Sequence, residues 1–299
     1  MKSTDLLKLT SICQHPKTIY DSRGRAILVP CGHCLFCLSQ KANERKRVLT
    51  SELNSHKYTL FVSLTYDEEN IPLLDLVSSD FRNKYDAYDV QTGEYICSHV
   101  FDSKKDVINL RCKSNHNGLV PYAPSRDLQL FIKRVRKYLS KYTNEKIRYY
   151  AISEYGQLHF RPHFHILFTF DEKPTFCNMR KAILKSWSHG HVDTQLPKDK
   201  RRSSGYLSQY LNSYLSIPSF FKEREVRPRI FHSAMLGFTF DKTLKDAIIK
   251  EDFERVINYL AHRFDGITVE TPVPAWRSYE NYLFPKCKGY SILSDTQRL

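Results

Sequence analysis

The sequence predicts an α+β fold in which an antiparallel sheet is flanked by helices. Segments rich in β-branched and aromatic residues, typical of strands, occur at 58–66, 146–156 and 163–170. Apolar residues recur at helical spacing at 127–142 and 177–188. Strands and helices in this order favour a mostly antiparallel sheet with helices packed against it.

The chain divides into three expected parts. A cysteine-rich element and a helix occupy residues 1–57, a core domain occupies 58–220, and a helical and irregular extension packed on the core occupies 221–299. Within the core, residues 67–122 are polar and predict an irregular insertion with a small hairpin around Tyr95 to Val100. Further helical patterns cover residues 38–53, 206–216 and 251–264, and a further strand covers 191–196.

Composition indicates a folded protein with a polyanionic partner. Of the 299 residues 41% are hydrophobic, which is ample for a packed core, and the net charge of +14 favours nucleic acid. No run of about 18 apolar residues is present, so we expect no membrane span, and the first residues do not form a secretory signal. A cytoplasmic protein with reduced thiols among its eight cysteines is therefore expected.

Two histidines in the stretch RPHFHILF form the main candidate metal site. In a strand, His163 and His165 project from the same face, whereas Phe164 and its apolar neighbours face the core. Glu154 on the preceding strand is brought back by a short loop and supplies a third ligand, with His159 in that loop as a competitor. Two imidazoles and a carboxylate suit a transition metal, or Mg²⁺ or Mn²⁺ when phosphate completes the shell. An isolated His-x-His is common, and two half-exposed structural histidines are the alternative.

A tyrosine series follows a basic loop that contains Lys200, Arg201 and Arg202. Tyr206, Tyr210 and Tyr214 are four residues apart, which places them on one face of a helix. An aromatic core stripe is the alternative interpretation. A tyrosine beside a metal can instead attack a phosphodiester and hold the 5′ phosphate covalently.

Three cysteines follow the spacing Cys-x-x-Cys-x-x-Cys. Lys41 stands where a ferredoxin-like run needs its fourth cysteine, which argues against an iron–sulfur cluster. A structural zinc site needs four ligands, so Cys13 is the expected fourth, with His15 or His33 as substitutes. The expected zinc ligands are Cys13, Cys31, Cys34 and Cys37.

Taken together, these residues resemble a known group. FVSLTY at 61–66, RPHFHILF and a downstream Tyr-x-x-x-Tyr are similar to motifs of the HUH endonucleases of rolling-circle replication. More closely, the chain resembles the replication initiators of gokushovirus-like, single-stranded-DNA bacteriophages of the microvirus family. The resemblance extends nearly end to end through VPCGHCLFC, DLQLFIKRVRK, SEYG and WRSYENYLFPKCKGYS.

The resemblance implies an antiparallel sheet akin to an RNA-recognition fold and a metal-dependent nick in single-stranded origin DNA. It assigns His163, His165 and Glu154 to Mg²⁺ or Mn²⁺, and it makes Tyr206 and Tyr210 the alternating nucleophiles. Leu64 and Thr65 would support the site. It also implies a host helicase and polymerase as partners in the bacterial cytoplasm. Ser213 replaces a lysine that relatives often carry.

Basic residues supply the expected DNA contacts. They lie on the helix from 127 to 142 and in the basic loop, and such contacts bind phosphates without selecting sequence. Tyr149, Tyr150 and Phe160 could stack on unpaired bases, with core packing as the alternative. The expected DNA-binding residues are Lys133, Arg134, Arg136, Lys137, Lys200, Arg201 and Arg202. Two alternative functions stay open: a non-catalytic zinc-containing DNA-binding protein, and a tyrosine transposase of the HUH superfamily.

Overall fold

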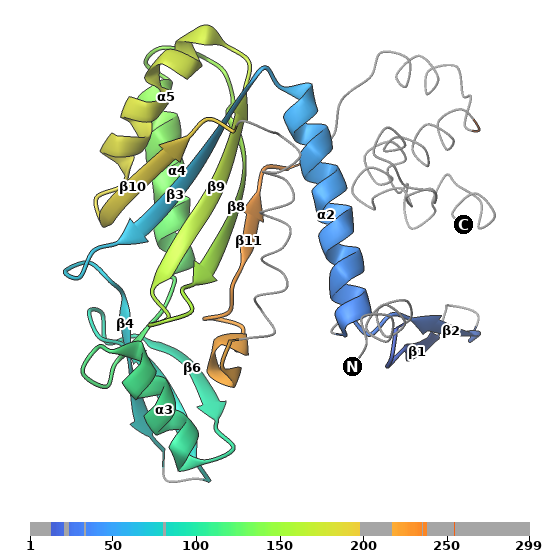
Figure 1. Cartoon of the computed structure of the whole chain (residues 1–299), viewed down its shortest axis with the longest axis vertical. Helices are drawn as coiled ribbons and strands as arrows, with labels where there is room; N and C mark the ends of the chain where they lie inside the picture. The colour runs from blue at the N-terminus through green and yellow to red at the C-terminus, as the bar shows by residue number, and fades with distance from the viewer. Residues whose placement is uncertain are drawn as a thin grey trace, which may run out of the picture.

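A five-stranded antiparallel sheet lies at the centre of the residues that the structure, a computed structural model, describes (Figure 1). These are residues 13–20, 24–32, 34–79, 82–197, 217–234, 236–237 and 254. The strand order is β10-β3-β9-β8-β11, and every neighbouring pair is antiparallel. The strands are β3 (Tyr58–Tyr66), β8 (Arg148–Tyr155), β9 (Pro162–Phe170), β10 (Gly190–Gln195) and β11 (Ile230–His232). The predicted α+β class with an antiparallel sheet is confirmed.

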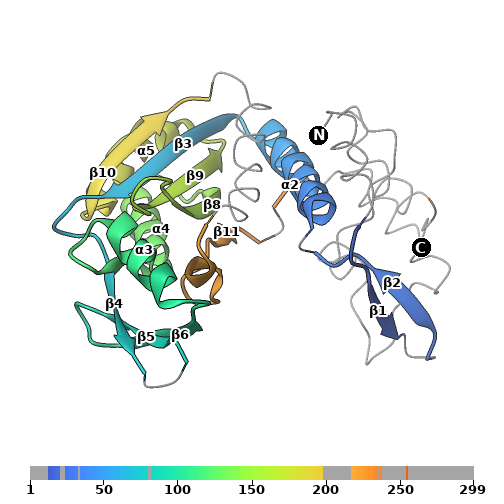
Figure 2. The ribbon, with the colours of Figure 1, turned by 60° about the horizontal axis from the view of Figure 1, so that its bottom comes forward.

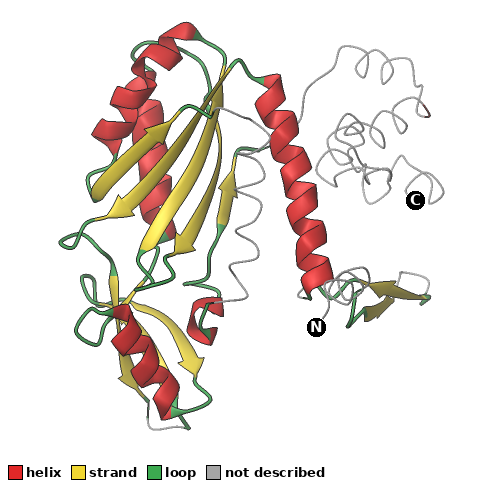
Figure 3. Cartoon of the chain, viewed as in Figure 1, coloured by secondary structure: helices red, strands yellow, loops and turns green. Residues whose placement is uncertain are grey.

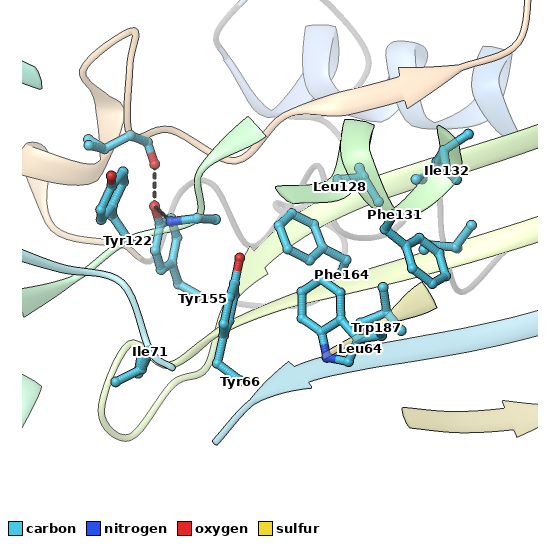
Figure 4. Close-up of a cluster of buried hydrophobic side chains, with 14 of the residues drawn as sticks. Leu64, Tyr66, Ile71, Tyr122, Leu128, Phe131, Ile132, Tyr155, Phe164 and Trp187 are labelled. Atoms are coloured by element: carbon cyan, nitrogen blue, oxygen red, sulfur yellow. Dashed lines mark hydrogen bonds between the residues drawn. The ribbon is translucent and has the colours of Figure 1, made fainter. Parts of the chain in front are cut away.

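One face of this sheet is covered by α4 (Ser125–Leu139) and α5 (Lys173–Ser186), as Figure 3 shows. Leu64, Phe164 and Phe168 are fully buried on this face, as their alternation along the strands predicts. The ring of Phe131 of α4 contacts those of Trp187 and Phe168, and Figure 4 shows it beside Trp187. Each fully buried side chain of this size contributes about 1.5–3 kcal/mol through removal from water.

The opposite face is covered over part of its length by α2 (Leu35–Ser55). Leu49 and Leu53 of this helix form a second apolar cluster with Tyr150 and other residues of β8 and β9. The buried carboxylate of Glu52 fixes the helix in place: it accepts hydrogen bonds from Arg148 Nε at 2.5 Å and from the Gly237 N–H at 2.6 Å. Among the described residues, α2 packs on this face against Tyr150, Ile152 and Leu167.

Residues 67–122 contain four strands and a helix, which we call the insertion unit, so the expectation of an irregular insertion is wrong. The hairpin expected around Tyr95 to Val100 is confirmed, because the strand at these residues pairs antiparallel with the strand before it. Four strands pair in the order β6-β5-β4-β7 in this described part of the chain, beside the helix α3. They are β4 (Leu73–Ser78), β5 (Lys84–Asp89), β6 (Tyr95–Val100) and β7 (Val120–Pro121), and α3 spans Lys104–Ser114. The strands are short and contain many polar residues. The polar Asp89 even closes a turn, since its Oδ1 accepts the N–H groups of Gln91 and Thr92.

The insertion unit shares one hydrophobic core with the central sheet, next to which it lies in Figure 2. Within the unit, Tyr122 donates to Asp89 Oδ2 at 2.5 Å. Tyr155 of β8, labelled in Figure 4, accepts the N–H of Ala123, the residue that follows the unit, and donates to the Val226 carbonyl at 2.5 Å. All three bonds are buried, which makes each of them costly to break. The relative orientation of the two sheets is therefore fixed by packed and hydrogen-bonded side chains.

The chain after residue 216 returns to both sheets. The 3-10 helix η1 (Ser219–Lys222) buries Phe220 and Phe221 in the core. His99 of β6 lies between two residues of this segment, with Nδ1 2.7 Å from Glu223 Oε1 and Nε2 3.1 Å from Ser219 Oγ. These contacts attach η1 to the insertion unit, and β11 then completes the central sheet at its β8 edge.

The amino-terminal part consists of a hairpin, β1 (Lys17–Tyr20) and β2 (Ala26–Val29), followed by α2. Figure 1 places the hairpin at the first turn of α2, away from the insertion unit. Among the described residues, no helix has the length and apolar character needed to cross a membrane. The helical patterns predicted at 206–216 and 251–264 lie outside the described residues, apart from residue 254.

Candidate functional sites

Glu154 and the two histidines lie together on the face of the sheet that α2 covers only in part. In the strand register, Glu154 of β8 stands opposite His163 of β9. On the other side of β9, Thr65 pairs with His163 and Ser63 pairs with His165. Because cross-strand partners share a face, these five residues form one polar patch. The prediction that a short loop returns Glu154 to His163 agrees with this register.

Within the patch, the carboxylate of Glu154 and the imidazole of His165 lie close enough to share a cation. His165 Nε2 lies 3.3 Å from Glu154 Oε2, and the ring centroids of His163 and His165 are 6.1 Å apart. Ser63 Oγ lies 3.0 Å from His165 Nδ1. When Nδ1–H is donated to the serine, Nε2 keeps its lone pair on the side of Glu154, which is the orientation that a metal ligand requires.

A cavity of about 410 Å³ opens beside these groups. Its lining consists of Thr65, Glu154, Tyr155, Gly156, Gln157, His163 and His165. No hydrogen bond joins either ring nitrogen of His163 to a residue that the structure describes. Burial lowers the pKa of His163, and His165 lowers it too, against an opposing effect of Glu154. A neutral imidazole beside a carboxylate is suited to hold a divalent cation.

Two residues of this site were missed in the sequence. Ser63 orients His165, and the alternation of β3 places it on the same face as Thr65, so the pattern FVSLTY could have identified it. Gly156 begins the β8–β9 turn, and a Cβ there would lie 3.2 Å from His163 Nε2, so glycine gives this ring its room. Of the expected supporting pair, Thr65 lines the cavity, whereas Leu64 is fully buried in the core.

Several other candidates lie away from the patch. The competing ligand His159 has its Nδ1 3.1 Å from the Lys113 carbonyl, at the end of α3. Tyr150 and Phe160, two of the candidate stacking residues, are both buried and serve packing. The candidate nucleophiles and the basic loop lie outside the described residues; they are Tyr206, Tyr210, Lys200, Arg201 and Arg202.

The basic residues of α4 lie on the other side of the sheet from the histidines. Lys133, Arg134, Arg136 and Lys137 are exposed on the outer surface of the helix, whose inner surface packs against Phe168. Arg136 is partly engaged, since it donates to the Ile147 carbonyl. These side chains could bind phosphates, but not those of a strand that lies directly on the histidine patch.

Four cysteine sulfurs gather at the first turn of α2. The Sγ atoms of Cys13, Cys31, Cys34 and Cys37 all lie within 4.8 Å of one another. Four of the separations run from 3.5 to 3.9 Å. Four sulfurs at about 2.3 Å from a tetrahedral zinc ion would be about 3.8 Å apart, so the cluster could hold zinc with little movement.

The local hydrogen bonds favour the thiolate form of Cys34, whereas burial raises the pKa of Cys37 to about 12. The backbone N–H groups of Cys37 and Gln14 lower the pKa of Cys34 to about 6, and zinc binds thiolate rather than thiol. Cys13 is the fourth member of the group, as the sequence predicts; His15 is not part of it, and His33 lies outside the described residues.

Comparisons with known proteins point to replication proteins of small viruses. A family model for replication-associated proteins of the ORF2 type matches residues 108–214, a little over a third of the chain. The matched range contains Glu154, His163, His165, Tyr206 and Tyr210. No solved structure matches the chain.

A curated relative extends the similarity beyond that range. The replication-associated protein ORF2 of Spiroplasma virus 4 is 24% identical over 237 residues, which cover 75% of this chain. The matched region spans 60% of that relative's length. The chain is thus similar to replication-associated proteins over most of its length, including the strands that carry the histidine patch.

Proposed function

We propose that this protein initiates rolling-circle DNA replication by nicking single-stranded origin DNA and later rejoining the displaced strand. The observation that carries the proposal is the placement of Glu154, His163 and His165 on adjacent strands around an open cavity. The similarity to replication-associated proteins over residues 108–214 supports it, because this range holds Glu154, both histidines and the tyrosine pair. On this proposal the central sheet is an HUH endonuclease core.

In the proposed reaction, the hydroxyl oxygen of Tyr206 or Tyr210 attacks a backbone phosphorus. The 5′ phosphate of the downstream strand becomes esterified to the tyrosine, while the bond from phosphorus to the 3′ oxygen of the upstream strand breaks. The tyrosine loses one proton and the released 3′ oxygen gains one, so the step is balanced. The second tyrosine allows a second transfer, in which a 3′-hydroxyl attacks the tyrosine ester and reseals the strand.

The roles of the protein groups follow from their chemistry. His163, His165 and Glu154 would hold Mg²⁺ or Mn²⁺, which when bound supplies several kcal/mol of charge stabilisation at the scissile phosphate. This stabilisation matters because a tyrosine pKa near 10 makes the phenolate about 4 kcal/mol uphill at neutral pH. Ser63 holds His165 in orientation, and the basic loop at 200–202 would attract the DNA backbone.

The experiment is a search for a covalent adduct. The protein is incubated with single strands tiling the cognate genome, with and without Mn²⁺ or Mg²⁺, and separated under denaturing conditions. We expect an adduct that requires the metal and is abolished by His163→Ala. His232→Ala is the matched control, since His232 is exposed on β11 and does not line the cavity. Absence of any adduct along the whole genome would overturn the proposal.

Single tyrosine substitutions assign the nucleophile. Of the variants Tyr206→Phe and Tyr210→Phe, we expect one to block the first nick and the other to block rejoining. Tyr214→Phe, which changes a tyrosine outside the pair, should retain both nicking and rejoining. A tyrosine transposase of the same superfamily would depend on one tyrosine alone. The cellular part of the proposal places the protein in a bacterial cytoplasm with a host helicase and polymerase.

A second candidate function is favoured by the cysteine cluster alone. A non-catalytic, zinc-containing DNA-binding protein would need the four sulfurs but neither the histidines nor the tyrosines. It would bind DNA and form no adduct, and His163→Ala would leave its binding unchanged. The two functions are therefore separated by the same assay.

A further inference from the structure

A second cavity, of about 460 Å³, adjoins the histidine patch. Its lining consists of Glu68, Ser114, Asn115, His116, Gly156, Gln157, Leu158, His159, Arg161 and His163. Gly156, Gln157 and His163 also line the first cavity, so the two cavities adjoin. One wall is the end of α3 in the insertion unit, and the other is the β8–β9 turn, which lies at the end of the sheet nearest α3 in Figure 1.

Both walls are held in place without any ligand. In the turn, Gly156 N–H donates to the Arg161 carbonyl at 2.9 Å, and buried Phe160 adopts a positive φ of 53°. Arg161 ties the turn to the central sheet by donating to the Tyr66 carbonyl at 2.7 Å, and it also binds Glu68. The contact of His159 with the Lys113 carbonyl joins the two walls. A preformed cavity avoids an ordering cost when a ligand enters.

The lining chemistry favours a base over a phosphate. Phosphate needs several free donors and positive potential, but Glu68 already binds Arg161, and the end of α3 presents the carbonyl pole of a helix. The exposed amides of Asn115 and Gln157 instead offer both donors and acceptors, as the edge of a base does. Leu158, 77% exposed at the tip of the turn, adds an apolar surface on which a flat ring can lie.

We propose that this second cavity, which we call the base pocket, binds an unpaired nucleobase of the strand next to the scissile phosphate. The insertion unit would thereby help to choose the position of the nick. The inference rests on the proposed function for its substrate, single-stranded DNA, but it assigns a different set of residues. Since His163 forms the shared wall, a base in this pocket belongs to a nucleotide adjacent to the one at the histidine patch.

The test compares binding of DNA with and without bases. The full-length protein is titrated, without added divalent cations so that no nicking occurs, against labelled oligodeoxyadenylate and an abasic strand of the same length. The variant is Asn115→Gly with Gln157→Ala. Glycine suits position 115, whose φ is 57°, so the amide is removed without backbone strain. Gln129→Ala on α4, an exposed amide outside the pocket, is the matched control.

We expect the double variant to bind oligodeoxyadenylate roughly tenfold more weakly and to bind the abasic strand as the wild type does. The control should match the wild type on both strands, and thermal melting should show that both variants fold. Equal weakening on both strands would show phosphate binding instead and would overturn the proposal, as would no weakening. Because this binding needs no adduct, failure of the nicking assay and failure of the base pocket are separate results.

Discussion

His165 Nε2 lies 3.3 Å from a carboxylate oxygen of Glu154, although the residue directly opposite Glu154 in the register is His163. The carboxylate therefore reaches the diagonal neighbour, as longer side chains on twisted antiparallel strands can. Its charge also opposes the lowering of the His163 pKa, so the carboxylate acts on both imidazoles of the strand.

This relationship predicts that Glu154→Gln weakens metal binding while preserving shape. The amide removes the negative charge, so we expect the affinity for Mn²⁺ measured by calorimetry to fall at least about tenfold. Glu94→Gln, at an exposed turn of the insertion unit, should bind Mn²⁺ as the wild type does. If Glu154→Gln retains full affinity, Glu154 is not a ligand.

Ser63 should act as a positioning residue. Ser63→Ala removes the hydrogen-bond partner of His165 Nδ1, and we expect Mn²⁺ affinity to drop by roughly 10- to 100-fold. Ser63→Thr, which keeps the hydroxyl and suits a strand, should restore it. Ser78→Ala, at the exposed end of β4, is the control. A merely structural role would change the melting temperature and leave metal affinity intact.

Replacing one clustered cysteine should release a tightly bound metal. We expect the purified protein to contain one zinc ion, and Cys37→Ser to lose it, because a structural site needs all four ligands. Metal analysis of the protein measures this. Cys112→Ser, at an exposed cysteine of α3, should retain zinc. Equal zinc content in both variants would contradict a four-cysteine site.

Stability should depend on pH through Glu52. Burial alone would raise the pKa of this carboxyl, but hydrogen bonds from His56, Arg148 and the Gly237 N–H lower it to about 2. The resulting stabilisation is present above the ordinary value of 4.5 and is lost as pH falls toward about 2. The lowered pKa corresponds to roughly 3 kcal/mol in the free energy of unfolding.

His56 should have the opposite dependence. Its hydrogen bond to Glu52 raises the pKa of His56, so its contribution is full below 6.5 and is lost as pH rises through the raised pKa. Urea unfolding of wild type and Glu52→Gln between about pH 3 and pH 8 measures both effects. In Glu52→Gln, the free energy of unfolding should fall less steeply as the pH is lowered than it does in the wild type. An unchanged fall would show that the Glu52 contacts do not contribute to stability.

The basic face of α4 should affect DNA affinity but not chemistry. Lys133→Ala, Arg134→Ala and Lys137→Ala together remove three exposed charges from the side of the sheet opposite the histidines. We expect the slope of log affinity against log salt concentration for single strands to shrink by about 2. Adduct formation at saturating DNA should stay unchanged. An unaltered slope would mean that these basic residues face water and do not contact DNA phosphates.

Local patterns were enough to predict the strands that carry the histidine patch. Period-two alternation fixed the direction of His163 and Phe164, and the short connection from Glu154 to His163 left little choice of pairing. The spacing of Cys31, Cys34 and Cys37 predicted three members of the cysteine cluster. Cys13 was predicted as the fourth because no other thiol lies near them in the sequence. These features depend on neighbours in sequence.

The insertion unit could not be predicted in the same way. Its strands are about six residues long, and polar side chains such as Asp89 are buried because they close turns and bind Tyr122. Their stability comes from partners far along the chain, which no local window contains. The base pocket depends on this unit, since Asn115 and Gln157 are distant in sequence and meet only after both sheets have docked.

The contacts of His99 have a consequence for kinetics. Gln195 pairs with Phe61 of the central sheet, and Ser219 is held by His99 of the insertion unit. Gln195 and Ser219 flank the stretch of sequence that includes both candidate nucleophiles, and each is held to a unit that borders the histidine patch. Tethering replaces a bimolecular encounter by an effective concentration on the order of millimolar. Nicking by one bound molecule should then proceed at a rate independent of protein concentration.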